Sequence, residues 1–183
     1  MKRYKDMNYI QIREMDISNG PGIGISLFVS GCNIHCKNCF NKVAWDFNAG
    51  KPWTIEAEEK FIKLAKRPYI KRISILGGEP LDSKNAPVIA DLLFKLRKEF
   101  GNTKKIWLYT GYTYETLVFA NKNLRHVCET PEGKAIVLAD YLVDGTYIHD
   151  LKDLNLLYRG SANQRIIDVK KTLYEGAPYL RKD

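Results

Sequence analysis

The sequence predicts an α/β fold in which a mostly parallel sheet of about five to six strands forms an open partial barrel. Apolar runs of strand length alternate along the chain with segments of helical periodicity, which is typical of βαβ units. Such a strand number is too small for a closed eight-stranded barrel. The chain of 183 residues has the length of one domain with a sizeable core. We therefore expect a single domain over residues 1–183, with residues 1–8 and 170–183 at its periphery.

Two segments near the start of the chain have strand patterns. Tyr9–Met15 alternates apolar and polar residues, which predicts an edge or entry strand. Ile25–Ser30 is almost continuously apolar, as expected of a strand that is buried on both faces. Turn-forming residues separate the two at Asn19–Gly22. The second strand leads directly into a group of cysteines.

Helical spacing appears in two segments that follow. Thr54 is a suitable N-cap for the first helix. Its apolar residues recur at helical spacing: Ala57, Phe61, Leu64 and Ala65. Asp82 or Ser83 is predicted to cap the second helix, which Gly101 ends. Arg72–Leu76, between the two helices, is predicted to be a strand.

The second half of the chain continues the alternation. Lys105–Thr110 predicts a third buried strand, and a short helix is expected around Tyr114–Ala120. Residues 121–134 have no clear pattern and are expected to be irregular. The apolar stretch Ala135–Val143 is expected to hold a helix end and a strand, and Arg165–Val169 a last short strand. The tail after that strand is basic.

The composition excludes several classes of protein. A hydrophobic fraction of 45% and a charged fraction of 27% are those of an ordinary globular protein. The first fifteen residues lack the apolar core of a signal peptide, and no apolar run approaches the roughly 20 residues needed to cross a bilayer. We therefore expect a cytoplasmic protein that does not bind membranes.

The net charge of +8 invites the hypothesis of nucleic-acid binding. The lysines and arginines are scattered, however, and no nucleic-acid-binding motif accompanies them. Solvated helix faces explain the charge better than direct contact with nucleic acid. A third explanation is that the positive charge favours association with an acidic protein surface or an electron donor.

The cysteines carry the strongest chemical signal. Cys32, Cys36 and Cys39 fall within eight residues with the spacing C-x3-C-x2-C, whereas Cys128 is distant. Structural zinc sites normally have four protein ligands, and iron–sulfur clusters are usually held by four thiolates. Three thiolates on one loop therefore predict a four-iron, four-sulfur (4Fe-4S) cluster with one iron open for chemistry. The alternative is a zinc site with His35 as fourth ligand, whose side chain would have to fold back to reach the metal.

Other candidate residues follow the predicted strands at their carboxyl ends. Gly77-Gly78, Thr110-Gly111 and Asp144 each come directly after an apolar strand. Ligands in open α/β sheets bind at that edge, and glycines allow a ligand to approach the backbone closely. We therefore expect these residues to lie near the cysteines.

The cysteine spacing resembles the cluster loop of the radical S-adenosylmethionine (SAM) enzymes, and Gly77-Gly78-Glu79-Pro80 resembles their SAM-contacting segment. From about Asp16 to Asp168 the chain is similar to the activating proteins of the anaerobic (class III) ribonucleoside-triphosphate reductases. The further stretches that carry this resemblance are Asn19–Gly22, Ser26–Cys32, Trp107–Tyr112, Val143–Gly145 and Arg159–Gln164.

The resemblance implies a radical SAM domain, an open partial barrel that binds a 4Fe-4S cluster and SAM. The implied cluster ligands are Cys32, Cys36 and Cys39. The implied SAM contacts are Gly77, Gly78 and Glu79 for the methionine part, and the backbone around Asn38, Cys39 and Phe40 for the adenine. Many members of the superfamily have an aromatic residue before the third cysteine, whereas this chain has Asn38 there and Phe40 after it.

Two further SAM contacts are less specific. Thr110 and Asp144 could reach the methionine or the ribose of SAM. Alternatively, Thr110 caps the next helix and Asp144 forms an Asp-Gly turn. The aromatic residues Trp107, Tyr109, Tyr112 and Tyr114 are expected in the core.

The resemblance also implies a reaction and its partners. The protein would reductively cleave SAM, and the 5′-deoxyadenosyl radical would abstract hydrogen from a glycine on the large subunit of the anaerobic reductase. An electron donor such as flavodoxin is expected, and no general acid or base is needed. The segment Arg159–Gln164 is a candidate for contact with the reductase, and Cys128 is expected to be a plain thiol.

Three alternative functions stay open at this point. The chain could activate another glycyl radical enzyme, or act on a small molecule as the 7-carboxy-7-deazaguanine synthases do. It could also be a non-catalytic metal-binding module, in which the metal only supports the fold.

Overall fold

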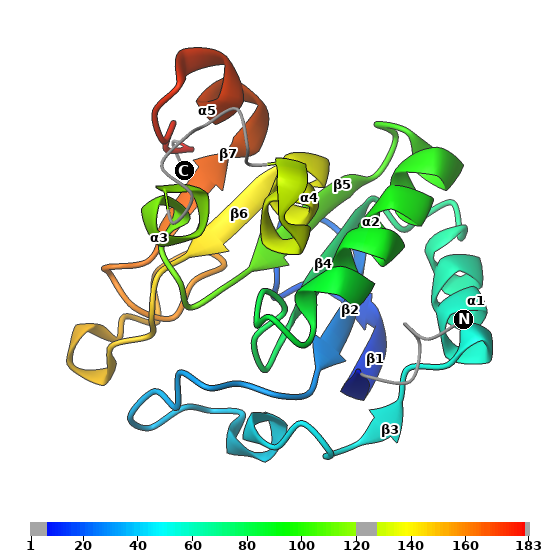
Figure 1. The fold of residues 1–183 in the computed structure, drawn as a ribbon, viewed down its shortest axis with the longest axis horizontal. Helices are drawn as coiled ribbons and strands as arrows, with labels where there is room; N and C mark the ends of the chain where they lie inside the picture. The colour runs from blue at the N-terminus through cyan, green and yellow to red at the C-terminus, as the bar shows by residue number, and fades with distance from the viewer. Residues whose placement is uncertain (1–6, 120–127, 182–183) are drawn as a thin grey trace.

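The computed structural model describes residues 7–119 and 128–181, and its centre is a sheet of seven strands in the order β3-β1-β2-β4-β5-β6-β7 (Figure 1). The strands are β1 (Asn8–Asp16), β2 (Gly24–Val29), β3 (Lys51–Pro52), β4 (Arg72–Gly77), β5 (Lys105–Tyr109), β6 (Tyr141–Asp144) and β7 (Arg165–Asp168). The four central strands β2, β4, β5 and β6 are parallel. The fold class is therefore mixed α/β, as the alternating pattern predicts.

Antiparallel strands extend the parallel centre on both sides. β1 pairs with β2 and β3 on one side, and β7 pairs with β6 on the other. The sheet has more strands than the five to six expected. The additional strand is β3, which follows Gly50 and has only two residues, too few to show a strand pattern in the sequence. β1 was expected to be an edge or entry strand. It lies next to the edge, because the short strand β3 pairs with its outer side.

Five α-helices are described: α1 (Ile55–Ala65), α2 (Ala86–Phe100), α3 (Tyr114–Phe119), α4 (Pro131–Leu138) and α5 (Val169–Glu175). Figure 1 shows α2 and α4 over one face of the sheet, with α1 beside α2. The main core lies between these helices and the sheet, and Leu27, Ile75 and Leu108 of the central strands are fully buried there. None of the described helices is long and apolar enough to span a membrane.

The opposite face of the sheet has a different composition. Ser26, Ser74, Trp107 and Tyr141 lie next to one another in register across the four parallel strands. Trp107 packs there with Val143 and Ile166 in a second, smaller apolar cluster. Since side chains alternate between the two faces of a strand, Leu76 and Tyr109, two residues further along β4 and β5, lie on this same face. Both line the candidate site described below.

Some helix boundaries agree with the sequence pattern and others do not. Thr54 caps α1, its hydroxyl accepting a hydrogen bond from the backbone N–H of Ala57 at 3.2 Å. Gly101 ends α2 with a φ of 53°. The predicted cap of α2 was wrong, because the helix begins after Asn85. Asp82 instead accepts hydrogen bonds from the Asn33 side chain and the Lys84 backbone, which keeps it in the preceding loop.

Two further differences concern the second half of the chain. Residues 131–134, expected to be irregular, form the first turn of α4, which Thr130 caps. Val169, expected to end a strand, begins the helix α5, because the side chain of Asp168 caps that helix through the backbone N–H of Lys171. Residues 121–127 of the segment expected to be irregular lie outside the described residues, as does Ala120 at the end of the expected short helix.

Candidate functional site

The cysteine loop joins β2 to the 3-10 helix η2 (Lys42–Trp45) at the carboxyl ends of the parallel strands. Its base is closed by backbone hydrogen bonds from Gly31 to Ala44 (2.8 Å) and from Cys32 to Trp45 (3.1 Å). Gly31 has a φ of 90°, a conformation that residues other than glycine rarely adopt. The loop therefore leaves the strand through a sharp turn and returns to the same edge of the sheet.

Cys32, Cys36 and Cys39 line one pocket, which we call the cysteine pocket. Cys32 is buried, and the other two are half-buried. Burial raises the pKa of the thiols of Cys32 and Cys36, so a bound cation is needed to favour their thiolate forms. Cys128 is exposed and lies elsewhere, beside α2 and α4.

The zinc alternative finds little support in this geometry. The imidazole ring of His35 stacks on Trp45 with the ring centroids 4.5 Å apart. Among the described residues, no three His, Cys, Asp or Glu side chains are grouped around a point that could hold one metal ion. An iron–sulfur cluster distributes its thiolate ligands over several irons, so its ligands need not converge on one point.

The pocket also contains polar atoms without a partner. The indole N–H of Trp45 and the hydroxyl of Tyr109 are buried and make no hydrogen bond within the described part of the chain. Both residues line the cysteine pocket. The three thiols that line this pocket fit the ligand set of an iron–sulfur cluster with one iron left open.

Gly77 and Gly78 lie against the start of the cysteine loop. The backbone N–H of Gly78 donates to Val29 at 2.8 Å, and that of Glu79 donates to Gly31 at 2.7 Å. A Cβ atom on Gly78 would lie 2.3 Å from the carbonyl oxygen of Gly31. A Cβ atom on Gly77 would lie 2.4 Å from the backbone nitrogen of Val29. Glycine at both positions therefore lets the end of β4 pack directly on the segment that carries Cys32.

The side chain of Glu79 is almost completely buried. Its carboxylate accepts hydrogen bonds from the backbone of Leu81 (2.9 Å), the hydroxyl of Thr110 (2.8 Å) and the backbone of Gly111 (2.7 Å). Burial raises its pKa to about 7, although these three donors favour the ionised form. Glu79 thus joins the ends of β4 and β5 at the border of the pocket.

Asn38 and Phe40, expected near the adenine of SAM, lie on either side of Cys39. Asn38 has a φ of 57° and lines a second pocket, and Phe40 is 87% exposed and lines both. Thr110 lines the cysteine pocket, and its hydroxyl also accepts a hydrogen bond from the backbone of Tyr112 at 3.2 Å. All residues expected to bind the cluster or SAM line one of these pockets, with the exception of Asp144.

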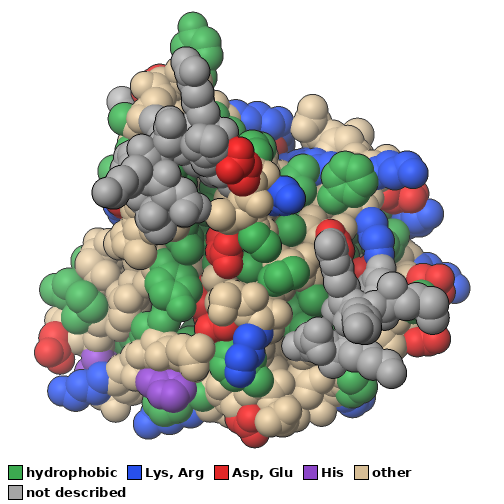
Figure 2. All heavy atoms as spheres, viewed as in Figure 1, with side chains coloured by type: hydrophobic (Ala, Val, Ile, Leu, Met, Phe, Trp, Pro, Cys, Tyr) green, Lys and Arg blue, Asp and Glu red, His purple; other side chains and the backbone are tan. Residues whose placement is uncertain are grey.

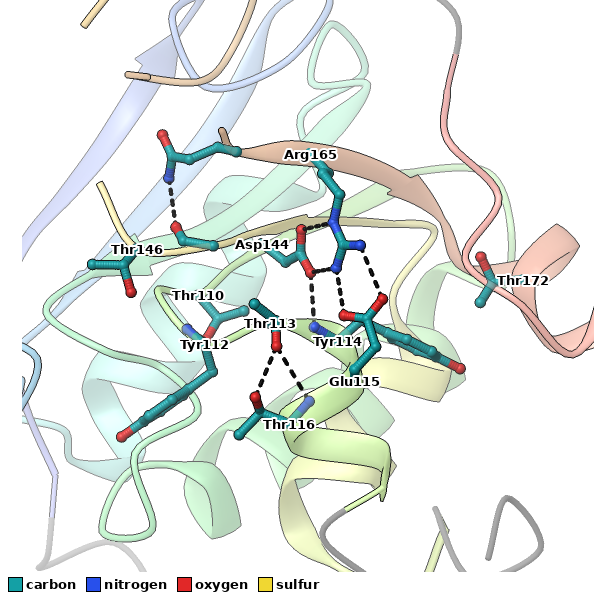
Figure 3. A network of polar contacts seen from close by, with 12 residues as sticks. Thr110, Tyr112, Thr113, Tyr114, Glu115, Thr116, Asp144, Thr146, Arg165 and Thr172 are labelled. Atoms are coloured by element: carbon teal, nitrogen blue, oxygen red, sulfur yellow. Dashed lines mark hydrogen bonds and ion pairs between the residues drawn. The ribbon is translucent and has the colours of Figure 1, made fainter. Parts of the chain in front are cut away.

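Asp144 belongs to a different network, which joins β6, β7 and α3 (Figure 3). Its carboxylate accepts a hydrogen bond from the backbone of Tyr114 at 2.7 Å and from Nε of Arg165 at 2.9 Å. Arg165 also pairs with both oxygens of Glu115, at 2.9 and 2.7 Å. These hydrogen bonds raise the pKa of Arg165 above its ordinary value, and the hydrogen bond to Asp144 has the largest effect. The neighbour of Asp144, Gly145, lines the cysteine pocket instead.

Several residues of the site were not predicted to bind a ligand. Tyr147 and Gln164 line both pockets, and Tyr109, expected only as a core residue, does so too. The sequence signal for Gln164 was its place in Arg159–Gln164, a stretch to which no role could be assigned beyond possible contact with a partner. No periodicity marks Tyr147, which lies in a loop.

The second pocket adjoins the cysteine pocket. Six residues line both: Cys39, Phe40, Leu76, Tyr109, Tyr147 and Gln164. The second pocket extends from them toward the loop between β6 and β7, which contributes Leu154, Tyr158 and Arg159 among others. The two pockets therefore adjoin, and together they reach from the cysteines to that loop.

Comparison with known proteins supports the metal chemistry. The family model described as a 4Fe-4S single cluster domain matches residues 18–167 of the chain. This range includes all three clustered cysteines and most of the sheet. The chain therefore contains a 4Fe-4S cluster domain.

Curated relatives cover almost the whole described fold. A protein of Escherichia coli (strain K12) is 41% identical over 160 residues, which are 86% of this chain and 96% of the relative. A protein of Vibrio cholerae is 38% identical over 162 residues (87% of this chain, 97% of the relative). A protein of enterobacteria phage T4 is 32% identical over 160 residues, which are 87% of this chain and 93% of the relative. All three are named anaerobic ribonucleoside-triphosphate reductase-activating protein.

Proposed function

The chain belongs to the family of the anaerobic ribonucleoside-triphosphate reductase-activating proteins, and from this premise we propose that it is a radical SAM enzyme that installs a glycyl radical on such a reductase. In this proposal the open sheet is the partial barrel of the radical SAM enzymes. The observation that carries the proposal is the convergence of Cys32, Cys36 and Cys39 with Gly77–Glu79 in one pocket.

The cysteine loop would hold the cluster. Cys32, Cys36 and Cys39 supply three thiolates from one short loop, and one iron is left for SAM. When bound, the reduced cluster supplies one electron to SAM, which yields methionine and a 5′-deoxyadenosyl radical that takes a hydrogen atom from a glycine of the reductase. No residue of this chain has to act as a general acid or base in that chemistry.

The neighbouring strand ends would orient SAM. Gly77 and Gly78 present backbone at the border of the pocket, and Thr110, at the end of the neighbouring strand, lines it too. Glu79 keeps these two strand ends together through its hydrogen bonds to Thr110 and Gly111. Its carboxylate is therefore better suited to positioning the pocket wall than to binding SAM itself.

The apolar side chains of the pocket would exclude water. Ile34, Trp45 and Leu76 line the pocket together with the cysteines and Tyr147. A dry pocket prevents side reactions of a reactive radical, and it tunes the reduction potential of a bound cluster. Phe40 lies next to Cys39, which suits contact with the adenine of SAM.

The partners follow from the same proposal. The relatives are named for their action on an anaerobic ribonucleoside-triphosphate reductase, and we assign the large subunit of such a reductase as the partner of this chain. A flavodoxin-like electron donor would reduce the cluster. The net charge of +8 favours association with an acidic donor of that kind.

Electron paramagnetic resonance under anaerobic conditions tests the proposal. The iron-reconstituted, reduced protein is mixed with SAM and the anaerobic reductase of the same source. A SAM-dependent glycyl doublet on the reductase is the expected result. If the reduced-cluster signal changes with SAM but no glycyl radical forms, the partner is wrong and another glycyl radical enzyme or a small molecule is the target. If no iron–sulfur signal forms, the proposal fails entirely.

A further inference from the structure

The segment between β6 and β7, residues 145–164, forms a closed and well-connected loop, which we call the 145–164 loop. Gln164 holds its base, since its amide N–H donates to Gly145 at 3.0 Å and its carbonyl accepts from the backbone of Gly160 at 2.8 Å. The side chain of Asn163 donates to the backbone of Thr146 at 2.8 Å. The stretch Arg159–Gln164, whose role the sequence does not reveal, thus closes the loop.

Contacts further along the loop keep it in one shape. Ser161 is fully buried, and its hydroxyl accepts a hydrogen bond from the backbone of Ile148 at 3.2 Å. The backbone of Ala162 donates to Leu151 at 2.8 Å, and Lys152 forms an isolated antiparallel bridge with Ser161. A loop whose ends are close and whose interior is hydrogen-bonded presents its outer side chains in a defined arrangement.

Those outer side chains are unusually apolar. Four large aliphatic residues of the loop are exposed: Ile148 (41%), Leu151 (43%), Leu154 (87%) and Leu157 (51%). In Figure 1 this loop projects from the sheet at the lower left, and Figure 2 shows hydrophobic side chains among charged ones at that end of the molecule. Single exposed leucines are common on protein surfaces, but four large aliphatic residues exposed on one ordered loop indicate an interaction site.

The position of the loop indicates what it contacts. Leu154 lines the second pocket, which shares six residues with the cysteine pocket. A protein that brings one of its own residues to the cysteines from the side of the second pocket passes against the loop. The charged residues that line the second pocket are Lys152, Arg159 and a single acid, Asp153, which favours a neutral or acidic partner segment.

We propose that the 145–164 loop is the docking surface for the anaerobic reductase, with Leu154 and Leu157 as its apolar anchors. This inference rests on the function proposed above and adds the surface through which the partner is recognised. An ordered loop costs less entropy on binding than a flexible one, and buried aliphatic side chains supply the affinity. The hydrogen bonds of Gln164 and Asn163 hold the anchors in place before the partner arrives.

The test compares Leu154→Ser and Leu157→Ser with Phe94→Ser. Phe94 is 62% exposed on α2 and serves as a matched control, because it lines neither of the two adjoining pockets. Affinity for the anaerobic reductase is measured by isothermal titration calorimetry with the cluster-loaded proteins. We expect each loop variant to raise the Kd for the reductase about tenfold, which corresponds to the loss of one well-buried aliphatic side chain. The control Phe94→Ser should bind the reductase with the affinity of the parent.

Two further readouts separate the surface from the chemistry. SAM cleavage by the chemically reduced protein without the reductase should be the same in Leu157→Ser, which lines neither pocket, as in the parent, while the glycyl radical yield at low reductase concentration falls about tenfold. If the parent protein binds the reductase but does not cleave SAM, this result contradicts the proposed function but not the proposal that the 145–164 loop is the docking surface. Unchanged reductase affinity in both loop variants would overturn the docking surface.

Two other results would also overturn this inference. If Phe94→Ser weakened binding as much as the loop variants, the effect would not belong to the loop. If the loop variants changed the oligomeric state of the chain alone, measured by sedimentation, and left reductase affinity intact, the loop would be a contact between copies of this chain.

Discussion

The hydroxyl of Thr110 donates a 2.8 Å hydrogen bond to the carboxylate of Glu79, and this contact connects the ends of two neighbouring parallel strands. The other carboxylate oxygen accepts a hydrogen bond from the backbone of Gly111, so both oxygens hold the same turn. Both side chains were expected to contact a ligand, and the structure shows that they contact each other. Substitution of either residue will therefore act on the pocket through the position of its walls.

Replacement of Glu79 by glutamine should change the pH dependence of stability. Burial raises the pKa of Glu79 to about 7, above its ordinary value of 4.5, so the folded state binds more protons than the unfolded state between these pH values. The free energy of unfolding contributed by Glu79 is therefore fully present below pH 4.5 and is lost as the pH rises toward 7. The slope is at most about 1.4 kcal/mol per pH unit.

Urea unfolding of the cluster-free protein at pH 5, 6, 7 and 8 measures this slope. The Glu79→Gln variant should lack it, so the difference between the two proteins isolates the contribution of Glu79. The variant should also lose about 1–3 kcal/mol at low pH if its amide N–H₂ faces one of the three donors. Equal slopes in both proteins would contradict a raised pKa.

Replacement of Cys36 by alanine should remove the cluster and leave the fold. The side chain of Cys36 is half-buried at the pocket and belongs to neither apolar core cluster, so we expect the unfolding midpoint to change little. Iron content and the visible absorbance of the cluster should fall to background, and SAM cleavage with them. The matched control is Cys128→Ala, since that exposed thiol lies away from the pocket. Unfolding of Cys36→Ala would instead favour a structural metal site.

Replacement of Gly78 by alanine should distort the start of the cysteine loop. The new Cβ would meet backbone oxygens of Gly31 and Ala44 at 2.3 and 2.8 Å, and backbone cannot move aside as a flexible side chain can. We expect a loss of about 3 kcal/mol in unfolding free energy and weaker iron retention. Gly22→Ala is the control. The φ of 69° at Gly22 is unfavourable for alanine, but no atom beyond its chain neighbours lies within 4 Å of the new Cβ, so we expect this variant to lose only about 1 kcal/mol in unfolding free energy. Similar losses in both variants would show that the close packing is not decisive.

Replacement of Arg165 by alanine should be strongly destabilising. Asp144 is fully buried, and without Arg165 its carboxylate keeps only the backbone N–H of Tyr114 among its described partners. Removing one partner of a buried ion pair costs about 3–5 kcal/mol. Glu115→Ala removes the other, 40% exposed carboxylate and should cost less than about 1 kcal/mol. Urea unfolding measures the loss of unfolding free energy in both variants. A larger loss in Glu115→Ala than in Arg165→Ala would contradict the assignment of Asp144 as the main partner of Arg165.

Local patterns predicted much of the fold and the centre of the candidate site. The alternation in Tyr9–Met15 and the apolar run Ile25–Ser30 correspond to β1 and β2, because strand periodicity is written in neighbouring residues. Thr54 and Gly101 bound their helices as expected, since capping depends on one or two positions. Cys32, Cys36 and Cys39 line one pocket because eight residues of loop cannot separate them widely.

Other features have no local signature. Arg72 begins a strand and is only 1% exposed, and it is stabilised by the backbone oxygen of Asp16 at 2.6 Å, from a residue far away in the sequence. Likewise, β3 depends on its pairing with β1 rather than on its own two residues. A side chain's partner across the sheet cannot be read from the pattern around either residue.

The sequence by itself determined the order of the strands and helices other than β3 and α5, the three-cysteine loop and the glycine segment at the end of β4, because each depends on residues close together in the chain. Only the tertiary structure decided that Glu79 contacts Thr110, that Asp144 contacts Arg165, and that residues 145–164 close into a loop beside the cysteines. These pairings arise when parallel strands bring distant segments to one edge of the sheet. Buried polar groups there must find partners among whatever groups the packing places nearby.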